Sequence, residues 1–163
     1  MRKLLTVALC LLLMPLTGFE IPQETKIPED AVGIWQVPEL GTSSPLYAGE
    51  QIGQEIVDRE DSALIRSFGR GRIICDHLDS RVGGGIWNVG EMKVGSTAFL
   101  ILPDRTLSYR CTAVWIVKDG AYSYTWNGAA VWPAHSTDIM CASCAITEGE
   151  NYLACFEYVG EMP

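Results

Sequence analysis

Asp138-Ile139-Met140-Cys141-Ala142-Ser143-Cys144 is the stretch of sequence that decides the fold. Its short and mostly apolar composition predicts a β-strand that ends in a thiol, and a polar turn follows at 147–150. Because side chains alternate between the faces of a strand, we expect the stretch to divide into two sets. One set is Met140, Ala142 and Cys144, and the other is Ile139, Cys141 and Ser143.

The spacing of Cys141 and Cys144 bears on whether they form a redox pair. On an extended strand their Cα atoms lie about 10 Å apart, at about 3.3 Å per residue. A disulfide requires a Cα separation of about 7 Å or less. We therefore predict that these cysteines are not bonded to each other. Cys144 then stands alone at the end of its strand, where a free thiol is a candidate nucleophile.

The composition predicts one globular domain that does not bind nucleic acid. The chain has 163 residues, of which 48% are apolar and 20% charged, and this is enough to build a sizeable core. Its net charge of −8 argues against binding to nucleic acid and to anionic membrane surfaces.

The N-terminal region predicts export from the cytoplasm. Residues 1–19 join a basic start, Met1-Arg2-Lys3, to an apolar run from Leu4 to Leu16, which predicts a cleaved signal peptide or a retained membrane anchor. In either case we expect the domain to be extracytoplasmic, secreted or held at the outer face of the membrane. Residues 20–45 contain four prolines and predict a spacer, so that the domain covers 46–163.

The rest of the chain predicts many short strands and little helix. Asp61-Ser62 is expected to cap a short helix over Ala63–Ser67. Strands are predicted at Arg72–Cys75, Thr97–Leu102, Leu107–Val117 and Asn151–Val159. This pattern is typical of a β-barrel or sandwich, and we expect the Cys144 strand to lie between the 107–117 and 151–159 strands.

Two histidines are candidate partners for the thiol. His77 ends a predicted strand and enters a glycine-rich loop, which is a common place for a catalytic base. His135 lies between Ala134 and Ser136 in a predicted surface loop. Because a free thiol is mostly protonated at neutral pH, a nearby imidazole would activate Cys144, and His77 is the better candidate.

Three motifs occur in an order that resembles the sortases, the cysteine transpeptidases that attach exported proteins to the Gram-positive cell wall. Ile73-Ile74-Cys75-Asp76-His77 resembles the strand that leads to the sortase histidine. Val89-Gly90-Glu91-Met92-Lys93-Val94-Gly95-Ser96 resembles the turn after it, with Ser96 where Asp is usual. Met140–Cys144 resembles the cysteine strand, with Ser143 keeping a hydroxyl before the thiol.

The resemblance covers about residues 45–159 and implies both a fold and an activity. The fold would be a closed, mainly β barrel of about eight strands with one or two short helices. Cys144 would be the nucleophile and His77 its acid/base partner, with no cofactor and no metal. The implied partners are a sorting-signal peptide of exported proteins and an amine acceptor on the cell wall or a pilin.

The chain departs from the sortase pattern at the active-site arginine. That residue is expected near 150–153, but no Arg or Lys follows Lys118. Asn151 occupies roughly its place and offers a neutral hydrogen-bond donor. The other candidates for substrate or oxyanion contacts are Ser143, Arg105 and Arg110.

Three other interpretations remain open on the sequence alone. The missing arginine favours a catalytically inactive, sortase-like binding protein. Cys141 and Cys144 would serve a thiol–disulfide oxidoreductase only at a helix N-terminus, and no helical pattern follows them. Cys75, His77, Cys141 and Cys144 are zinc-ligand types, but the two strand cysteines would have to converge.

Overall fold

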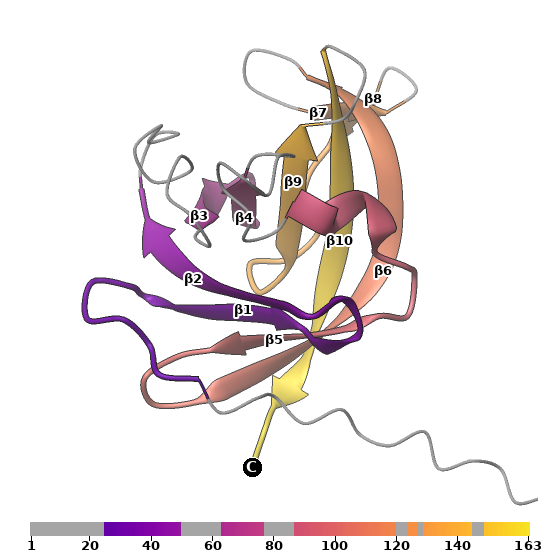
Figure 1. Ribbon diagram of the computed structural model, residues 1–163. Coiled ribbons are helices and arrows are strands. Elements are labelled where there is room, and N and C mark those ends of the chain that lie inside the picture. Colours follow the sequence, from indigo (N-terminus) through magenta and orange to yellow (C-terminus); the bar gives the residue numbers. More distant parts are fainter. Residues whose placement is uncertain (1–24, 50–62, 77–86, 120–123, 127–128, 145–148) are drawn as a thin grey trace, which may run out of the picture.

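The computed structural model describes residues 25–49, 63–76, 87–119, 124–126, 129–144 and 149–163 (Figure 1). The strands are β1 (Gly33–Val37), β2 (Thr42–Ala48), β3 (Ala63–Phe68), β4 (Gly71–Asp76), β5 (Thr97–Ile101), β6 (Thr106–Asp119), β7 (Tyr124–Trp126), β8 (Ala129–Val131), β9 (Ile139–Cys144) and β10 (Glu150–Glu161). Two short 3-10 helices are η1 (Pro38–Leu40) and η2 (Trp87–Glu91).

Eight of these strands close into a mixed β-barrel. The order around the barrel is β10-β9-β4-β3-β2-β1-β5-β6, and pairing of β10 with β6 closes it. Strands β7 and β8 continue from β6 as a small extension of the same sheet. The predicted mainly β, closed barrel of about eight strands is confirmed.

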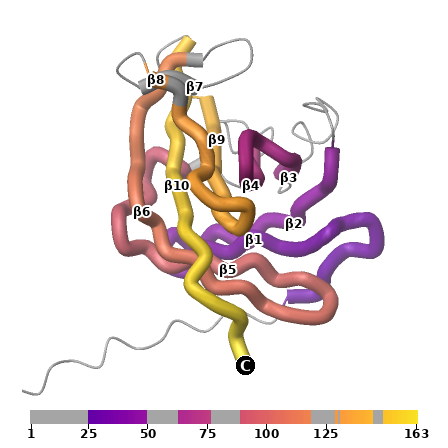
Figure 2. The backbone as a smooth tube through the Cα atoms, turned by 180° about the vertical axis from the view of Figure 1, so that it is seen from behind, coloured from indigo at the N-terminus to yellow at the C-terminus, as the bar shows by residue number. Residues whose placement is uncertain are grey.

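Strand β9 lies between β10 and β4. It pairs antiparallel with β10 and parallel with β4, and β6 lies on the far side of β10. Figure 2 shows β9, β10 and β6 side by side from behind. The prediction that the 107–117 strand flanks Cys144 was therefore wrong, while the 151–159 strand is a neighbour as expected. A parallel neighbour distant in sequence leaves no local turn signal, so the pairing with β4 was missed.

The barrel interior holds the main hydrophobic core. Every barrel strand sends alternate side chains into it, which is the pattern expected when one face of each strand is buried. Trp35 is at its centre, with its ring centroid 5.2 Å from that of Phe156 and 5.5 Å from that of Tyr109. Both contacts have the tilted or edge-to-face geometry that aromatic pairs prefer.

A second core covers the outer face of β4, β9 and β10. Its buried members come mainly from the other side of the same strands: Phe68, Ile73, Cys75, Val117, Val131, Met140, Ala142 and Leu153. Val131 is the last residue of β8, so the extension from β6 folds over this part of the barrel wall. Strands β4 and β9 are consequently apolar on both faces, as strands covered on both sides usually are.

Two sequence-based predictions were wrong in the N-terminal half. Residues 63–67 belong to strand β3 and not to a helix, because pairing on both sides overrides the local capping signal. The predicted spacer contains β1, which pairs with β2 and β5 and buries Ile34 and Trp35 completely. The domain therefore begins before residue 46. Among the parts of the chain that the structure describes, no helix has the length and apolar character needed to cross a bilayer.

The connection from β8 to β9 is held tightly against the start of β4. The backbone N–H of Arg72 donates to the carbonyl oxygen of Asp138 at 3.1 Å. Asp138 Oδ2 in turn accepts a 2.9 Å hydrogen bond from the backbone N–H of His135. Gly71 packs so closely here that an added Cβ would lie 2.5 Å from the Asp138 oxygen and 2.6 Å from Pro133 Cβ. This close packing sets where β9 begins relative to β4.

Replacement of Gly71 should therefore destabilise the barrel. We expect Gly71→Ala to lower the free energy of unfolding by about 1–3 kcal/mol, because the new methyl group forces the 133–138 segment away from β4. Gly160→Ala is the matched control on β10, where an added Cβ meets no atom within 4 Å. Urea unfolding measures both variants. Equal stabilities of the two would contradict the close packing at Gly71.

Candidate active site

Cys144 is the last residue of β9 and its side chain is exposed. Met140 and Ala142 share its face of the strand, as predicted, and both are buried under the outer core. The thiol thus marks the point where the covered outer face of β9 opens to solvent.

Asn151 lies directly across from Cys144. The two are partners in the register of β9 and β10, and Val117 of β6 is the next residue in the same row. Cross-strand partners point to the same face of a sheet, with Cβ atoms about 4.5–5.5 Å apart. Asn151 therefore has its half-buried amide on the same side of the wall as the thiol. The sequence-based placement of Asn151 beside Cys144 agrees with this register.

The ends of β4 and β9 also lie together. Their parallel register runs from Arg72 opposite Ile139 to Asp76 opposite Ser143. The next residues along the two chains are His77 and Cys144. His77 lies outside the described residues, so only the strand that leads to it is placed.

The inner face at this end of the barrel carries a polar row. Asp76, Ser143 and Tyr152 are neighbours across β4, β9 and β10. Asp76 and Ser143 are almost fully buried, and Ser143 Oγ has no hydrogen-bond partner among the described residues. Helix η2 packs against β9 and β10 here, with Gly90 against the ring of Tyr152. Ser143 faces the barrel interior and Cys144 the outside, so the hydroxyl and the thiol are on opposite sides of the wall.

Cys144 differs from the other described cysteines in exposure. None of the five described cysteines forms a disulfide, so the prediction that Cys141 and Cys144 are not bonded is confirmed. Burial raises the pKa of Cys111 to about 11 and that of Cys155 to about 12. Burial also raises the pKa of Cys141 well above its ordinary value. A thiol with a raised pKa stays protonated and unreactive at neutral pH.

The geometry does not support the metal or redox interpretations. Cys141 points into the barrel and Cys144 away from it, so the two sulfurs are separated by the wall. Within the described residues no cluster of three His, Cys, Asp or Glu side chains has metal-binding geometry. Cys144 ends a strand and not a loop that leads into a helix, which is the usual setting of a reactive C-x-x-C pair.

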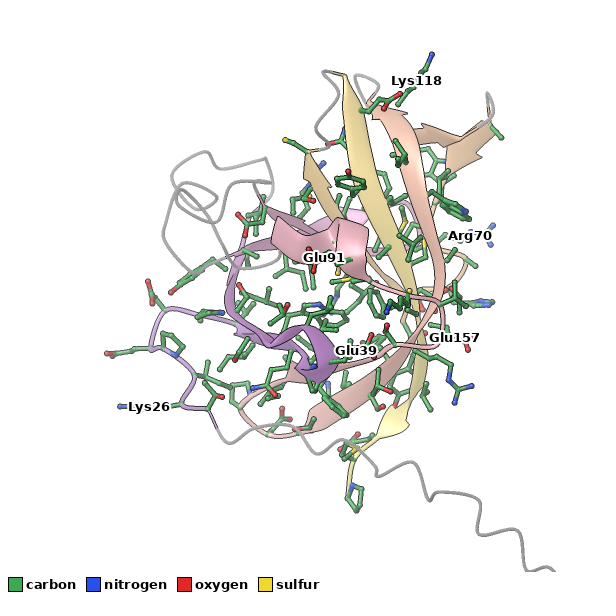
Figure 3. The ribbon with its side chains drawn as sticks, turned by 45° about the vertical axis from the view of Figure 1, so that its right-hand side comes forward. Lys26, Glu39, Arg70, Glu91, Lys118 and Glu157 are labelled. Carbon is green, nitrogen blue, oxygen red and sulfur yellow. The ribbon has the colours of Figure 1, made fainter. Side chains whose placement is uncertain are left out.

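Arg105 and Arg110 lie far from the thiol. Arg110 is opposite Glu157, seven residues along β6 from Val117, which corresponds to about 23 Å at about 3.3 Å per residue. Figure 3 shows Glu157 well below Lys118, which lies at the Cys144 end of β6. Arg105 precedes β6 and is farther still. The structure therefore brings Asn151 and Ser143 to Cys144, and not the two arginines.

His135 is at the opposite end of β9 from the thiol. It is exposed and belongs to the turn that precedes Ile139. The six residues of β9 separate this turn from Cys144, a length of about 17 Å. His135 therefore does not face Cys144.

Comparison with solved structures identifies the architecture. A sortase C from Streptococcus pneumoniae matches with a TM-score of 0.64 at 14% identity, over 83% of this chain and 73% of that one. The barrel has a sortase-like fold. Sortase E1 from Streptomyces coelicolor, solved with a tripeptide in its active site, matches with a TM-score of 0.63 at 13% identity, over 85% and 94% of the two chains. The SrtA sortase from Actinomyces oris has a TM-score of 0.63 at 14% identity, over 90% and 89%.

The similarity to sortases is one of fold. No protein-family model matches the sequence, and no curated protein matches it. At 10–15% identity the agreement lies in the strand order and the barrel, and catalysis depends on the particular residues at the end of β9.

The exposure difference predicts which thiol reacts first. In the folded protein at pH 8, we expect iodoacetamide to modify Cys144 much faster than Cys75, Cys111, Cys141 or Cys155. The reason is that Cys75, Cys111 and Cys141 are buried and Cys155 is partly buried with a raised pKa. Peptide mapping by mass spectrometry over a time course measures this, with urea-unfolded protein as the control. Labelling of Cys111 or Cys141 at the Cys144 rate would contradict the buried core.

Proposed function

We propose that this protein is a sortase-like cysteine transpeptidase with Cys144 as its nucleophile and His77 as the acid/base partner. The observation that carries the proposal is the parallel register of β4 and β9, which brings the ends of both strands to one edge of a sortase-like barrel. The exposed thiol is at that edge.

Cys144 suits a nucleophile by exposure and by position. Its thiolate attacks the carbonyl carbon of a peptide bond, and a C–S bond forms while the C–N bond breaks. The leaving amine takes a proton from the imidazolium. An incoming amine then attacks the thioester and gives a proton to the imidazole. A C–N bond forms while the C–S bond breaks, which releases the thiolate and completes the transfer.

His77 suits the acid/base role because of the residue before it. Asp76 is paired with Ser143, and each of these residues is followed directly by one member of the proposed couple. Consecutive Cα atoms are 3.8 Å apart, so His77 Cα is within 3.8 Å of a residue that is already next to β9. The other histidine, His135, is at the far end of the strand.

Asn151 is the proposed oxyanion donor. It is the cross-strand partner of Cys144 and occupies the neighbourhood in which the sortase resemblance expects an arginine. An amide N–H stabilises an oxyanion by a neutral hydrogen bond, without the charge of a guanidinium. We therefore expect a slower reaction than with an arginine, but the same order of bond-making and bond-breaking.

The proposed substrates and location follow from the same activity. The acyl donor is a sorting-signal peptide of an exported protein, and the acceptor is an amine of the cell wall or of a pilin. Such substrates lie outside the cytoplasm, which agrees with the export signal expected at residues 1–19. The chain would be secreted or held by that segment at the outer face of the membrane.

A catalytically inactive, sortase-like binding protein is the second candidate. The observation that favours it is Asn151, since the position opposite the thiol carries no positive charge. In that case the peptide would bind beside Cys144 without forming a thioester.

The roles of the two histidines are separable by mutation. We expect His77→Ala to abolish acylation of Cys144 by a sorting-peptide analogue with a thiol-reactive group, because the imidazole is needed to form the thiolate. His135→Ala should leave acylation nearly unchanged, since His135 is at the other end of β9. Intact-protein mass spectrometry measures the adduct. Equal rates in both variants would refute the assignment of His77, and an unreactive wild type would support the binding-only candidate.

The role of Asn151 has its own test. We expect Asn151→Ala to lower the acylation rate about 10²–10³-fold, the usual effect of removing one oxyanion donor. Arg110→Ala is the control, because Arg110 lies opposite Glu157 and far from the thiol. Asn151→Arg should react at least as fast as wild type. A wild-type rate in Asn151→Ala would exclude this residue as the donor.

A further inference from the structure

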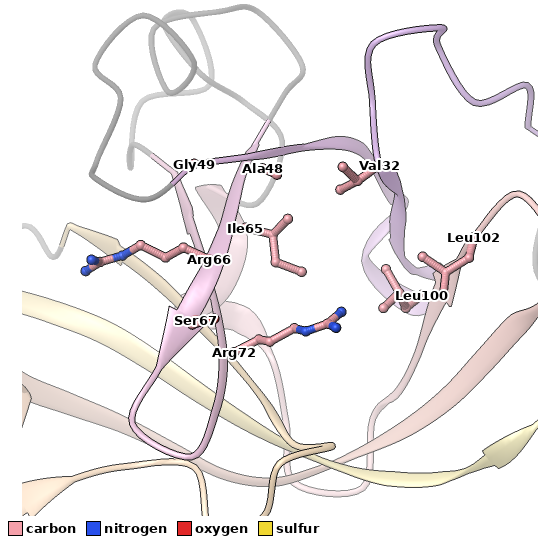
Figure 4. Close-up of a pocket in the computed structure, with 9 residues that line it drawn as sticks. All are labelled: Val32, Ala48, Gly49, Ile65, Arg66, Ser67, Arg72, Leu100 and Leu102. Atoms are coloured by element: carbon pink, nitrogen blue, oxygen red, sulfur yellow. The ribbon is translucent and has the colours of Figure 1, made fainter.

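The barrel has a pocket at its other mouth, away from Cys144. The pocket has a volume of about 480 Å³, which is within the range of small-molecule sites. It lies between the β3–β4 hairpin and the β1–β5 side of the barrel (Figure 4). Arg72 begins β4 beside the start of β9, so about 16 Å of strand separates this mouth from the thiol. The pocket is therefore distinct from the proposed active site.

The pocket walls are mainly apolar. Val32, Ile65, Leu100 and Leu102 face it from both sides. Ile65 and Leu100 are buried members of the barrel core, so part of the pocket wall is formed by the core itself. Such walls favour an apolar ligand body over a fully hydrated ion.

One guanidinium group points across this apolar space. Figure 4 shows the Arg72 side chain extending between Ile65 and Leu100, whereas Arg66 points away from them. Burial raises the pKa of Tyr109 to about 12, and the positive charge of Arg72 opposes that rise. Arg72 itself is exposed, so its guanidinium lies in the open part of the pocket where a ligand can reach it.

Among the described residues, no carboxylate is paired with the guanidinium of Arg72. None of the described residues that line the pocket is acidic, although the whole chain has a net charge of −8. Within the described residues Arg72 forms no salt bridge. Asp138, which precedes the cross-strand partner of Arg72, accepts a hydrogen bond at Oδ2 from the backbone N–H of His135.

Two buried polar side-chain atoms lie on strands next to Leu100, one of the residues that line the pocket. Trp35 pairs with Leu100 across β1 and β5, and with Ser44 across β1 and β2. Trp35 Nε1 and Ser44 Oγ are buried and have no hydrogen-bond partner among the described residues.

We propose that this mouth of the barrel binds a small molecule with a carboxylate on an apolar body, held by the Arg72 guanidinium. A guanidinium matches a carboxylate with two parallel hydrogen bonds, and few protein groups do so as well. The apolar body lies against Leu100, Leu102 and Val32. Free fatty acids and the C-terminus of an apolar peptide both have this chemistry.

Isothermal titration of the full-length protein with decanoate tests the proposal. We expect saturable binding with one ligand per chain, and decanol should bind at least tenfold more weakly because it lacks the charge. N-acetyl-trileucine and its C-terminal amide form a second pair of probes. Tighter binding of decanoate assigns the site to fatty acids, and tighter binding of the free-acid peptide assigns it to a peptide C-terminus.

Arg72→Met and Arg66→Met are the matched variants. Arg72→Met should weaken the binding of the tighter acid at least tenfold and leave decanol binding unchanged, while Arg66→Met should change neither more than twofold. Circular dichroism checks folding. If Arg72→Met does not fold, the comparison of the acid with its uncharged analogue on the wild-type protein still tests whether the site requires a carboxylate. The proposal would be overturned if no saturable binding were seen, or if the acid and its uncharged analogue bound equally well. Equal effects of the Arg72 and Arg66 substitutions would also overturn it.

Discussion

The parallel pairing of β4 with β9 is the interaction on which the rest of the structure depends. Parallel partners cannot be joined by a tight turn, and the chain between them forms β5, β6, β7 and β8 before it returns. Because parallel strands run in the same direction, both end at the same edge of the barrel. Asp76 and Ser143 are the last paired residues there. Any chemistry that requires the residues after both strands depends on this register.

The two faces of the barrel wall separate residues that are adjacent in sequence. Ser143 and Cys144 differ by one position, yet the hydroxyl is buried in the barrel and the thiol is exposed outside. Cys141 also points inward, where loss of solvation raises its pKa and keeps the thiol protonated. One short strand therefore carries both a core thiol and a solvent-facing one, and position alone decides which of them is accessible from solvent.

The neutral side chain opposite Cys144 sets this barrel apart from the sortase pattern that the sequence resembles. A guanidinium would add a full charge to the site, whereas Asn151 adds only a dipole. Arg72 does place a positive charge beside a hollow, at the far mouth of the same barrel. The start of β4 thus lies beside the apolar pocket, and its end lies at the edge of the barrel that carries the thiol.

The sequence by itself determined the local features of the site. Alternation along 138–144 was sufficient to put Met140, Ala142 and Cys144 on one face and to exclude a bridge from Cys141, since both follow from strand geometry alone. Turn signals and apolar runs likewise predicted a mainly β domain. The motif order predicted the sortase-like barrel.

Only the tertiary structure decided which distant strands are neighbours. β1 lies within the proline-containing segment that was predicted to be a spacer. β3 follows a helix-capping signal and was predicted to be a helix. Both are strands because barrel pairing satisfies their backbone groups and buries Trp35 and Ile65. Strand register also determines which strands pair with β9. It likewise sets the distance of Arg110 from the thiol and the position of Arg72 beside a pocket. Register depends on contacts between residues far apart in the chain, and local sequence patterns do not contain them.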